Sequence, residues 1–392
     1  MKTPIWRQSS TPGATGKATR SPPRRSARAD PLLPPGATIG ILGGGQLGRM
    51  LGLAAAQLGF KVHIYAPDAE SVAAEVTAHH SQAAWDDEPR LAAFAAACDV
   101  VTFEFENVPV DTVRFLAGHV AVRPGALGLE IAQDRLAEKR FVVDLGGRTA
   151  PFAPVPDRAA LDAALAEIGA PAILKTVRMG YDGKGQARIA RPQDADRAWE
   201  TIGGHAAILE GFVAFEHEFS VILVRGIDGE IRFWDSSVNV HEGGILATAS
   251  LPPPRSILDQ QDEARAMMAQ IADALDYVGV LTGEFFATDA GPVFNEMAPR
   301  VHNSGHWTIE GAVTSQFENH IRAIAGLPLG SAATRALPVV MRNLIGADIA
   351  IVPDLLADDR CHVHHYSKTE VREGRKLGHA TWAGAAPGAS PA

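Results

Sequence analysis

The chain has 392 residues, of which 46% are hydrophobic and 21% are charged. At about 100–200 residues per domain, this length predicts two to four domains with a large buried core, which excludes a disordered or fibrous product. No segment approaches the roughly 20 consecutive apolar residues of a membrane helix, so we expect a soluble, cytoplasmic protein without a membrane partner. Two cysteines, Cys98 and Cys361, cannot build a disulfide framework or a cysteine metal site.

The net charge is unevenly distributed along the chain. The whole chain carries −9 and residues 1–36 carry +6, so residues 37–392 carry −15. An acidic body does not favour duplex nucleic acid, and we expect no nucleic-acid partner. The Pro-, Ser- and Arg-rich composition of residues 1–36 predicts a disordered, dispensable extension. An over-long start codon assignment explains this segment at least as well as a transit peptide, because Pro recurs and no amphipathic helix pattern is present.

Strands and helices alternate along residues 37–133. We predict strands at 37–42, 61–66, 99–103 and 119–122, with helices after Gly43 through Leu58 and at 91–97. This alternation indicates an α/β domain with a parallel, doubly wound sheet.

A second unit follows Asp134, which is a good helix N-cap, and reads as α+β with much antiparallel pairing. Helices are predicted at 135–145, 158–168, 193–202 and 260–276, and strands at 171–176, 186–190, 206–210, 216–225, 230–240, 280–288 and 292–297. Strands at 338–346 and 361–372 predict a small C-terminal β unit, and residues 383–392 read as a disordered low-complexity tail.

Two glycine-rich segments could receive phosphate groups. Gly43-x-Gly45-x-x-Gly48 follows a strand and opens a helix, where backbone N–H groups can bind an anion. Binding of a nicotinamide cofactor would also require an acidic residue at the end of the second strand to hold the ribose. That strand ends in Ala66-Pro67, which does not fit this requirement. The segment Gly180 to Gln186, six residues after Lys175, can fold over polyphosphate oxygens, although it lacks the Walker spacing. A tight turn and a solvated hairpin remain the structural alternatives.

Paired carboxylates indicate a metal site. If Asp289-Ala-Gly291 is a three-residue hairpin loop, positions that sum to 580 are paired, and Glu284 lies opposite Glu296. Two close carboxylates, with Asn295 as a neutral oxygen ligand, suit Mg²⁺ bound together with substrate phosphates. Cross-strand glutamates without a function remain the alternative.

Polar residues cluster directly after this hairpin. Arg300 can bind an oxyanion with two hydrogen bonds, and His302 can donate to it or exchange a proton near neutral pH. A second basic cluster, at 372–379, suits a sugar phosphate. Earlier in the chain, the strand end at Glu210 to Val213 can offer backbone groups to an adenine edge, and Glu218 can accept hydrogen bonds from ribose hydroxyls; singly, each glutamate also reads as a solvated carboxylate.

Five motifs in this order resemble the N5-carboxyaminoimidazole ribonucleotide synthetases, a family of ATP-grasp ligases of purine biosynthesis. The resemblance spans about residues 37–382, and the segments that carry it are 46–50, 102–107, 180–186, 295–306 and 374–379. It implies an ATP-grasp fold with an N-terminal biotin-carboxylase-like doubly wound domain at 37–133, an ATP-grasp unit at 134–330 with a lid at about 150–213 and a central domain at about 214–330, and the β unit at 331–382. The family normally continues past the Gly-His of the last motif, so we expect a truncated C-terminus.

The resemblance also assigns roles to residues. ATP would be bound by Arg135, Lys175, Gly180, Tyr181, Asp182, Gly183, Lys184, Gly185, Gln186, Glu210, Gly211, Phe212, Val213, Glu218, His241, Asn295 and Glu296. Two Mg²⁺, with Mn²⁺ as an alternative, would be bound by Glu284, Glu296 and Asn295. The aminoimidazole ribonucleotide would be held by Gln46, Glu106, Tyr181, Asn303, Ser304, Arg375 and Lys376. The catalytic groups would be Arg300, His302, Asp182, Lys184 and Lys376.

The family reaction is an ATP-dependent carboxylation. Bicarbonate attacks the γ-phosphate of ATP, and the resulting carboxyphosphate supplies CO₂ to the amine of aminoimidazole ribonucleotide. The resemblance further suggests a homodimer. The alternatives are another ATP-grasp ligase such as the formate-dependent transformylase, a catalytically silent ATP-binding module, and a nicotinamide oxidoreductase, which leaves the paired glutamates unexplained.

Overall fold

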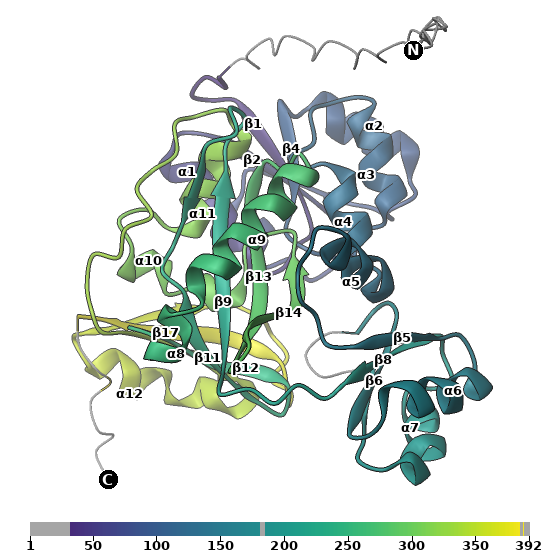
Figure 1. The fold of residues 1–392 in the computed structure, drawn as a ribbon. Coiled ribbons are helices and arrows are strands. Elements are labelled where there is room, and N and C mark those ends of the chain that lie inside the picture. The colour runs from purple at the N-terminus through teal and green to yellow at the C-terminus, as the bar shows by residue number, and fades with distance from the viewer. Residues whose placement is uncertain (1–31, 181–184, 385–386, 388–392) are drawn as a thin grey trace, which may run out of the picture.

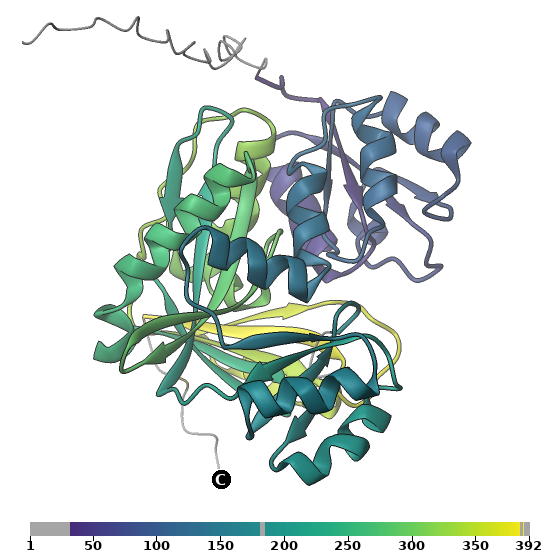
Figure 2. The same cartoon turned by 45° about the vertical axis from the view of Figure 1, so that its right-hand side comes forward.

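The computed structural model describes residues 32–180, 185–384 and 387. Within them, three sheets organise the chain (Figures 1 and 2). The predicted extension lies mostly outside the described residues, but Leu33 already packs against the core and its N–H donates to the carbonyl of Ala325. None of the described helices is long and apolar enough to span a bilayer. Cys98 and Cys361 are both free thiols.

The N-terminal sheet is parallel with strand order β3-β2-β1-β4, as the alternating pattern predicts. Its elements are β1 (Thr38–Leu42), α1 (Gln46–Gln57), β2 (Lys61–Ala66), η1 (Ala74–Val76), β3 (His79–Gln82), α2 (Glu88–Ala96), β4 (Val100–Phe103), α3 (Val110–Ala117) and α4 (Ala126–Ala132). The strand expected at 119–122 is wrong, because that segment makes only one isolated bridge, from Val101 to Val122. The polar edge strand β3 has no apolar pattern and was not predicted.

Helix α5 (Arg135–Asp144) joins this domain to the second sheet and begins as predicted at Asp134, whose carboxylate accepts from the N–H groups of Leu136 and Ala137. The second sheet is antiparallel, in the order β5-β8-β6-β7. Its elements are β5 (Phe152–Val155), α6 (Arg158–Ile168), β6 (Ala172–Thr176), β7 (Gln186–Ile189), η2 (Pro192–Asp194), α7 (Ala195–Thr201) and β8 (Ala207–Gly211). It projects at the lower right of Figure 1, with α6 and α7 on its outer face.

The third sheet has nine strands in the order β14-β13-β9-β11-β12-β15-β17-β16, with β10 paired to β9. The strands are β9 (His217–Arg225), β10 (Ile231–Phe233), β11 (Ser237–Glu242), β12 (Ile245–Leu251), β13 (Gly279–Thr288), β14 (Gly291–Ala298), β15 (Val339–Ile345), β16 (Cys361–His365) and β17 (Lys376–Ala383). The helices are α8 (Arg255–Leu258), α9 (Gln261–Ala274), η3 (Asn303–Gly305), α10 (Thr308–Gly311), α11 (Gln316–Ile324), η4 (Gly346–Ile351) and α12 (Val352–Ala357).

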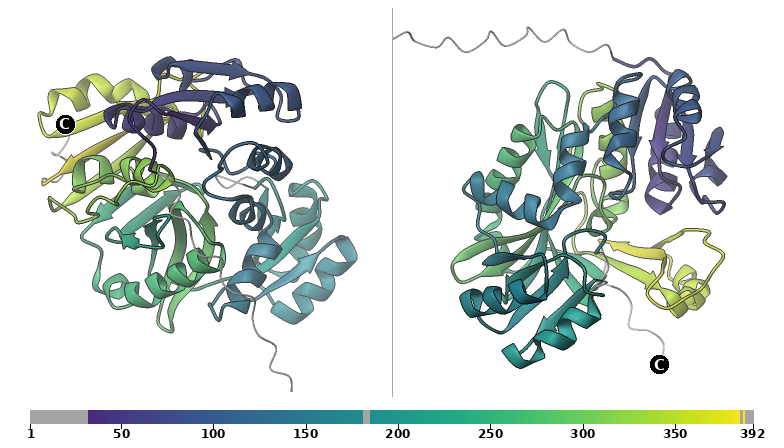
Figure 3. Two further views of the ribbon diagram at one scale, coloured as in Figure 1. Left: turned by 90° about the horizontal axis from the view of Figure 1, so that it is seen from above. Right: turned by 90° about the vertical axis from the view of Figure 1, so that its right-hand side faces the viewer.

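Two strand predictions in this region need correction. The single strand expected at 230–240 is split into β10 and β11, and the strand expected at 361–372 ends at His365. The strands of the expected C-terminal unit continue the large sheet through the pairing of β12 with β15. Seen from above in Figure 3, helix α5 lies where the three sheets approach one another.

The β13–β14 hairpin pairs Glu284 with Glu296 as predicted, but the register next to the turn differs from the predicted one. The tight turn pairs Thr288 with Gly291, so the ladder next to the turn joins positions that sum to 579. A β-bulge between Glu284 and Phe285 then shifts the register by one residue and brings Glu284 opposite Glu296. The extra residue of the bulge offsets the shorter turn and restores the predicted pairing of Glu284 with Glu296.

His320 of α11 joins the N-terminal domain to the large sheet. Its Nδ1 accepts from the Val280 N–H (3.1 Å), so the ring proton is on Nε2, which donates to Thr102 Oγ1 (2.8 Å). The ring is fully buried, and burial lowers the pKa of His320 to about 3. The native contact therefore requires the neutral ring.

This burial predicts a specific pH dependence of stability. Below pH 6.5 the unfolded chain binds a proton at His320 that the native chain does not, so its contribution is complete above pH 6.5 and is lost as the pH falls towards 3. On urea unfolding, the wild type should lose about 1.4 kcal/mol per pH unit more than His320→Gln below pH 6.5. His362→Gln, at an exposed position, is the control, and parallel pH profiles for wild type and His320→Gln would contradict the assignment.

Candidate active site

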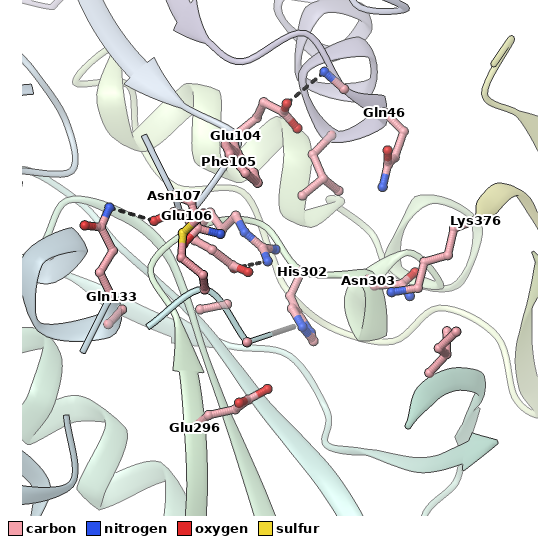
Figure 4. Close-up of a pocket in the computed structure, with 18 of the residues that line it drawn as sticks. Gln46, Glu104, Phe105, Glu106, Asn107, Gln133, Glu296, His302, Asn303 and Lys376 are labelled. Carbon is pink, nitrogen blue, oxygen red and sulfur yellow. Dashed lines mark hydrogen bonds and ion pairs between the residues drawn. The ribbon is translucent and has the colours of Figure 1, made fainter. Parts of the chain in front are cut away.

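A cavity of about 620 Å³ lies where residues from all three sheets meet (Figure 4). Ten of the predicted site residues line it with their side chains, and Gly180 contributes its backbone. They come from the carboxyl ends of the N-terminal strands, from β13 and β14, and from the loop between β16 and β17 with the start of β17. They are Gln46, Glu106, Arg135, Glu284, Glu296, Arg300, His302, Asn303, Arg375 and Lys376. Residues up to 330 positions apart in the chain therefore meet at this cavity.

Backbone N–H groups of the glycine-rich loop before α1 donate to a carboxyl group of the protein itself. The buried Glu104 accepts from the N–H groups of Gly45 (2.8 Å) and Gly48 (3.3 Å) through its two carboxylate oxygens. Burial raises the pKa of Glu104, although these hydrogen bonds act against the rise. The expected phosphate site at these N–H groups is therefore occupied by Glu104, and the loop serves the cavity by presenting Gln46.

Arg300 and Glu106 form an ion pair across the cavity wall. An Arg300 Nη2 donates to Glu106 Oε2, while Nη1 donates to the carbonyl of Val301 (3.0 Å). The loop that carries Glu106 is fixed by Gln133, whose Nε2 donates to the carbonyls of Glu106 (2.9 Å) and Val108 (2.7 Å). Arg300 is thus held at the wall of the cavity by contacts of both of its terminal nitrogens.

His302 is held on both sides. Its backbone N–H donates to Gln316 Oε1 (2.9 Å), and Gln316 Nε2 donates to its carbonyl (2.6 Å). Ser304 Oγ lies 2.9 Å from His302 Nδ1, and Glu284 Oε1 lies 3.7 Å from Nε2. Burial, followed by Arg300, lowers the pKa of His302 well below its usual value. The next residue, Asn303, lines the cavity with both polar atoms of its side chain unpaired, so they are available to a ligand.

The carboxylates of Glu284 and Glu296 differ in their surroundings. Burial and the charge of Glu296 raise the pKa of Glu284 to about 7. Burial also opposes ionisation of Glu296, but Arg135 and Lys175 outweigh it and lower the pKa of Glu296 to about 2. Arg135 binds Glu296 Oε2 (2.9 Å) and donates to the Gly180 carbonyl (2.8 Å). The pair is therefore short of positive charge on the Glu284 side.

Lys175 and Glu210 form a buried ion pair in the second sheet. Lys175 Nζ lies 2.9 Å from Glu210 Oε2, and Lys139 Nζ approaches the same oxygen to 3.6 Å. Burial opposes ionisation of Glu210, but the two lysines lower its pKa. One carboxylate oxygen of Glu210 therefore binds the two lysines, while Oε1 is buried without a partner.

Several predicted nucleotide residues lie outside the cavity lining. Glu218 Oε2 is 2.7 Å from His241 Nδ1, and this contact, against the effect of burial, raises the pKa of His241. Arg188 stacks over the exposed ring of Phe212. The others outside the lining are Lys175, Gly185, Gln186, Glu210, Gly211, Val213, Asn295 and Ser304. Tyr181, Asp182, Gly183 and Lys184 are not among the described residues.

The loop between β16 and β17 packs against the N-terminal domain and forms one wall of the cavity. Glu70 Oε1 accepts from the Thr369 N–H (2.8 Å), and Oε2 binds Arg375 (2.8 Å). These hydrogen bonds, first that from Thr369, lower the pKa of Glu70 to about 2. Burial, followed by Arg375, lowers the pKa of the neighbouring Lys368 to about 8. Arg375 and Lys376 thus belong to a cluster of cations at one end of the cavity.

Sequence reasoning missed three residues at this site. Glu104 and Lys368 also line the cavity, and Lys139 lies behind it. The helix spacing could have found Lys139, because it is four positions after Arg135 and so lies on the same face of α5. No local pattern marks Glu104 as the partner of a glycine loop 56–59 residues away.

Comparisons with known proteins agree with this arrangement. Three family models match in order: a ribonucleotide synthetase preATP-grasp domain at residues 36–133, an ATP-grasp domain at 140–317, and a phosphoribosylaminoimidazole carboxylase C-terminal domain at 339–388. The chain is 50% identical over 352 residues to an N5-carboxyaminoimidazole ribonucleotide synthase of Brucella melitensis, covering 89% of this chain and 97% of that protein.

Solved structures give the same result. An N5-carboxyaminoimidazole ribonucleotide synthetase from Thermus thermophilus is 48% identical, with a TM-score of 0.82, covering 88% of this chain and 93% of that one. A synthase from Aspergillus clavatus, solved with ADP and 5-aminoimidazole ribonucleotide, is 29% identical, with a TM-score of 0.83, covering 89% of this chain and 94% of that one.

The fold and the cavity define an ATP-grasp ligase with a preceding nucleotide-synthetase domain. Within that class, the chain belongs to the N5-carboxyaminoimidazole ribonucleotide synthase family.

The packing of Glu104 against the glycine loop can be tested with alanine. A Cβ at Gly43, where φ is +110°, would lie 2.6 Å from Glu104 Oε1, whereas a Cβ at Gly36, where φ is +86°, meets no atom within 4 Å. Gly36→Ala should cost about 1–2 kcal/mol of unfolding free energy from backbone strain alone. Gly43→Ala should cost roughly 1–3 kcal/mol more, because Glu104 must leave its N–H partners. Equal losses in urea unfolding would contradict the role given to Glu104.

Proposed function

We propose that this protein converts 5-aminoimidazole ribonucleotide, bicarbonate and ATP into N5-carboxyaminoimidazole ribonucleotide, ADP and phosphate in purine biosynthesis. The observation that carries the proposal is the 50% identity to a synthase of this name over nearly the whole of both chains. The cavity supports it, because acidic, basic and neutral polar groups converge there from separate domains.

The carboxylate pair fits a divalent cation. Glu284 and Glu296 are hard oxygen donors on adjacent strands, and burial followed by the charge of Glu296 raises the pKa of Glu284. Mg²⁺ binds through one or two carboxylates together with substrate phosphates, which suits this donor set. When bound, Mg²⁺ would neutralise phosphate charge during phosphoryl transfer. Asn295 is a weaker candidate ligand, because it lies outside the cavity lining.

Cations around the cavity are placed to hold ATP. Arg135 lines the cavity between Glu296 and Gly180, and Lys175 stands at the end of β6, next to the segment that begins at Gly180. We assign phosphate binding to both residues and coverage of the phosphates to Gly180–Gln186. The sheet from β5 to β8 would act as a lid that excludes water from a short-lived carboxyphosphate. The strand end at Glu210–Val213, with Glu218 and His241, would contact the nucleoside.

The other end of the cavity suits the second and third substrates. Arg300 can bind bicarbonate with two N–H groups, and the neutral His302 ring can donate one hydrogen bond to it. We assign Gln46, Glu106, Asn303, Arg375 and Lys376 to the aminoimidazole ribonucleotide, whose phosphate matches the cluster of Arg375, Lys376 and Lys368. Asp182, Lys184 and Tyr181 are proposed to reach the imidazole or its carboxylation intermediate.

The remaining assignments follow from the family. We propose a homodimer that works in the cytoplasm with small-molecule substrates, Mg²⁺ as its metal and Mn²⁺ as a substitute. We propose three domains, at 37–133, 134–330 and 331–382, with the lid of the second at about 150–213. A catalytically silent ATP-binding module remains the second candidate.

Turnover tests the function directly. ADP release should require Mg-ATP, bicarbonate and 5-aminoimidazole ribonucleotide together, and formate should not replace bicarbonate. Glu296→Ala should reduce kcat by a factor of about 100 or more, because the loss of a preorganised charge at a phosphoryl-transfer site costs several kcal/mol. Glu200→Ala, at an exposed position on α7, should match the wild type.

Two outcomes would contradict the proposal. Formate-dependent ADP release would assign the protein to the transformylase type of ligase. Tight Mg-ATP binding without turnover, with all three substrates present, would favour the silent module.

A further inference from the structure

Strand β14, which carries Glu296, lies at the edge of the nine-stranded sheet. Its only partner in the described sheet is β13, so its outer backbone groups have no neighbouring strand. An isolated bridge to Thr149 satisfies part of this edge, through the hydrogen bond from the Phe294 N–H to the Arg148 carbonyl (2.8 Å). Buried backbone groups without a partner would cost about 1–3 kcal/mol each.

Two buried side chains of α5 satisfy two further backbone groups of this edge. Lys139 Nζ donates to the Asn295 carbonyl (2.5 Å), and Glu138 Oε1 accepts from the Met297 N–H (2.8 Å). Their exposed fractions are 0% and 2%, so water cannot replace these bonds. The two bonds hold the peptide groups directly on either side of Glu296.

The spacing along α5 explains how three of its residues reach three consecutive strand residues. Arg135, Glu138 and Lys139 stand at positions i, i+3 and i+4, which share one helix face. Arg135 binds the side chain of Glu296, while the other two bind the backbone at residues 295 and 297. In Figure 1, α5 lies beside β14 and above the lid strands.

Lys139 also connects this edge to the lid. Its ammonium group lies 3.6 Å from Glu210 Oε2, which pairs with Lys175 at 2.9 Å. The strand of Glu296 and the strand of Lys175 therefore share a buried chain of charges through Lys139.

We propose that Glu138 and Lys139 are positioning residues that replace a missing neighbouring strand and fix the backbone around Glu296, so that its carboxylate meets the metal–nucleotide complex in one geometry. The inference rests on the proposed function only in taking Glu296 as a metal ligand. Lys139 lies outside the cavity lining, whereas Glu138 is part of that lining and uses one carboxylate oxygen to accept from the Met297 N–H. In this proposal both residues act through β14. Partners that orient a metal ligand typically contribute a factor of 10–100 in metal affinity.

The test measures Mn²⁺ binding to the complex of the full chain with ADP, by the electron paramagnetic resonance of the free ion. Glu138→Leu removes the acceptor for the Met297 N–H, whereas Glu138→Gln keeps one. We expect Glu138→Leu to weaken Mn²⁺ binding by about 10- to 100-fold, Glu138→Gln by no more than about threefold, and ADP binding without a divalent ion to change less than about twofold in both. Lys139→Met should weaken Mn²⁺ binding by a similar factor to Glu138→Leu.

The matched control is Arg140→Leu, which places the same side chain on the exposed face of the same helix turn and should bind Mn²⁺ as the wild type does. Hydrogen exchange gives a readout without metal: amides of residues 294–297 should exchange faster in Glu138→Leu than in Glu138→Gln. Wild-type Mn²⁺ affinity in Glu138→Leu, or equal losses in the Leu and Gln variants, would overturn the inference.

Failure of the proposed function is distinguishable from failure of this inference. Neither measurement needs bicarbonate or 5-aminoimidazole ribonucleotide, so a wild-type protein that binds Mn²⁺ with ADP but shows no turnover would refute the proposed reaction and leave the positioning role standing. A wild type that takes up no Mn²⁺ with ADP would overturn the inference.

Discussion

The rest of the site depends on two carboxylates being held side by side on neighbouring strands. Glu284 and Glu296 repel each other, and their partial burial makes that repulsion stronger than it would be in water. The fold tolerates the pair because cations approach Glu296 from α5 and from the second sheet, while Glu284 keeps an elevated pKa. The unequal surroundings favour ionisation of Glu296 and oppose ionisation of Glu284, and the proposed divalent cation would bind between these two states.

The sequence predicted the parts of the structure that depend on local patterns. The parallel N-terminal sheet, the start of α5 at Asp134 and the helix at 158–168 follow from alternation and capping, and the structure confirms them. The pairing of Glu284 with Glu296 was also predicted, but the correct pairing depended on an unforeseen bulge that compensates for a shorter turn. The agreement on this pair therefore came from two deviations that cancel.

Features that depend on distant contacts could not be predicted. Gly45 and Gly48 fit an anion site by local chemistry, and only the fold shows that Glu104 supplies the anion. In the same way, Lys139 reads as an ordinary helix lysine until β14 and Glu210 are placed against it. The resemblance to a known family identified cavity residues such as Asn303 and Lys376, which composition and spacing alone would have left among many polar side chains.

The bond between Glu70 and Arg375 joins positions 305 residues apart. Synthesis completes the N-terminal sheet at β4, and the loop at residues 368–376, which builds part of the cavity wall, follows much later. Because domains generally fold as units in the order in which they emerge, the early domain must wait with Glu70 and the cavity-facing end of its glycine loop open to water. A nascent chain halted before β17 would therefore lack Lys376, and this wall of the cavity would be incomplete.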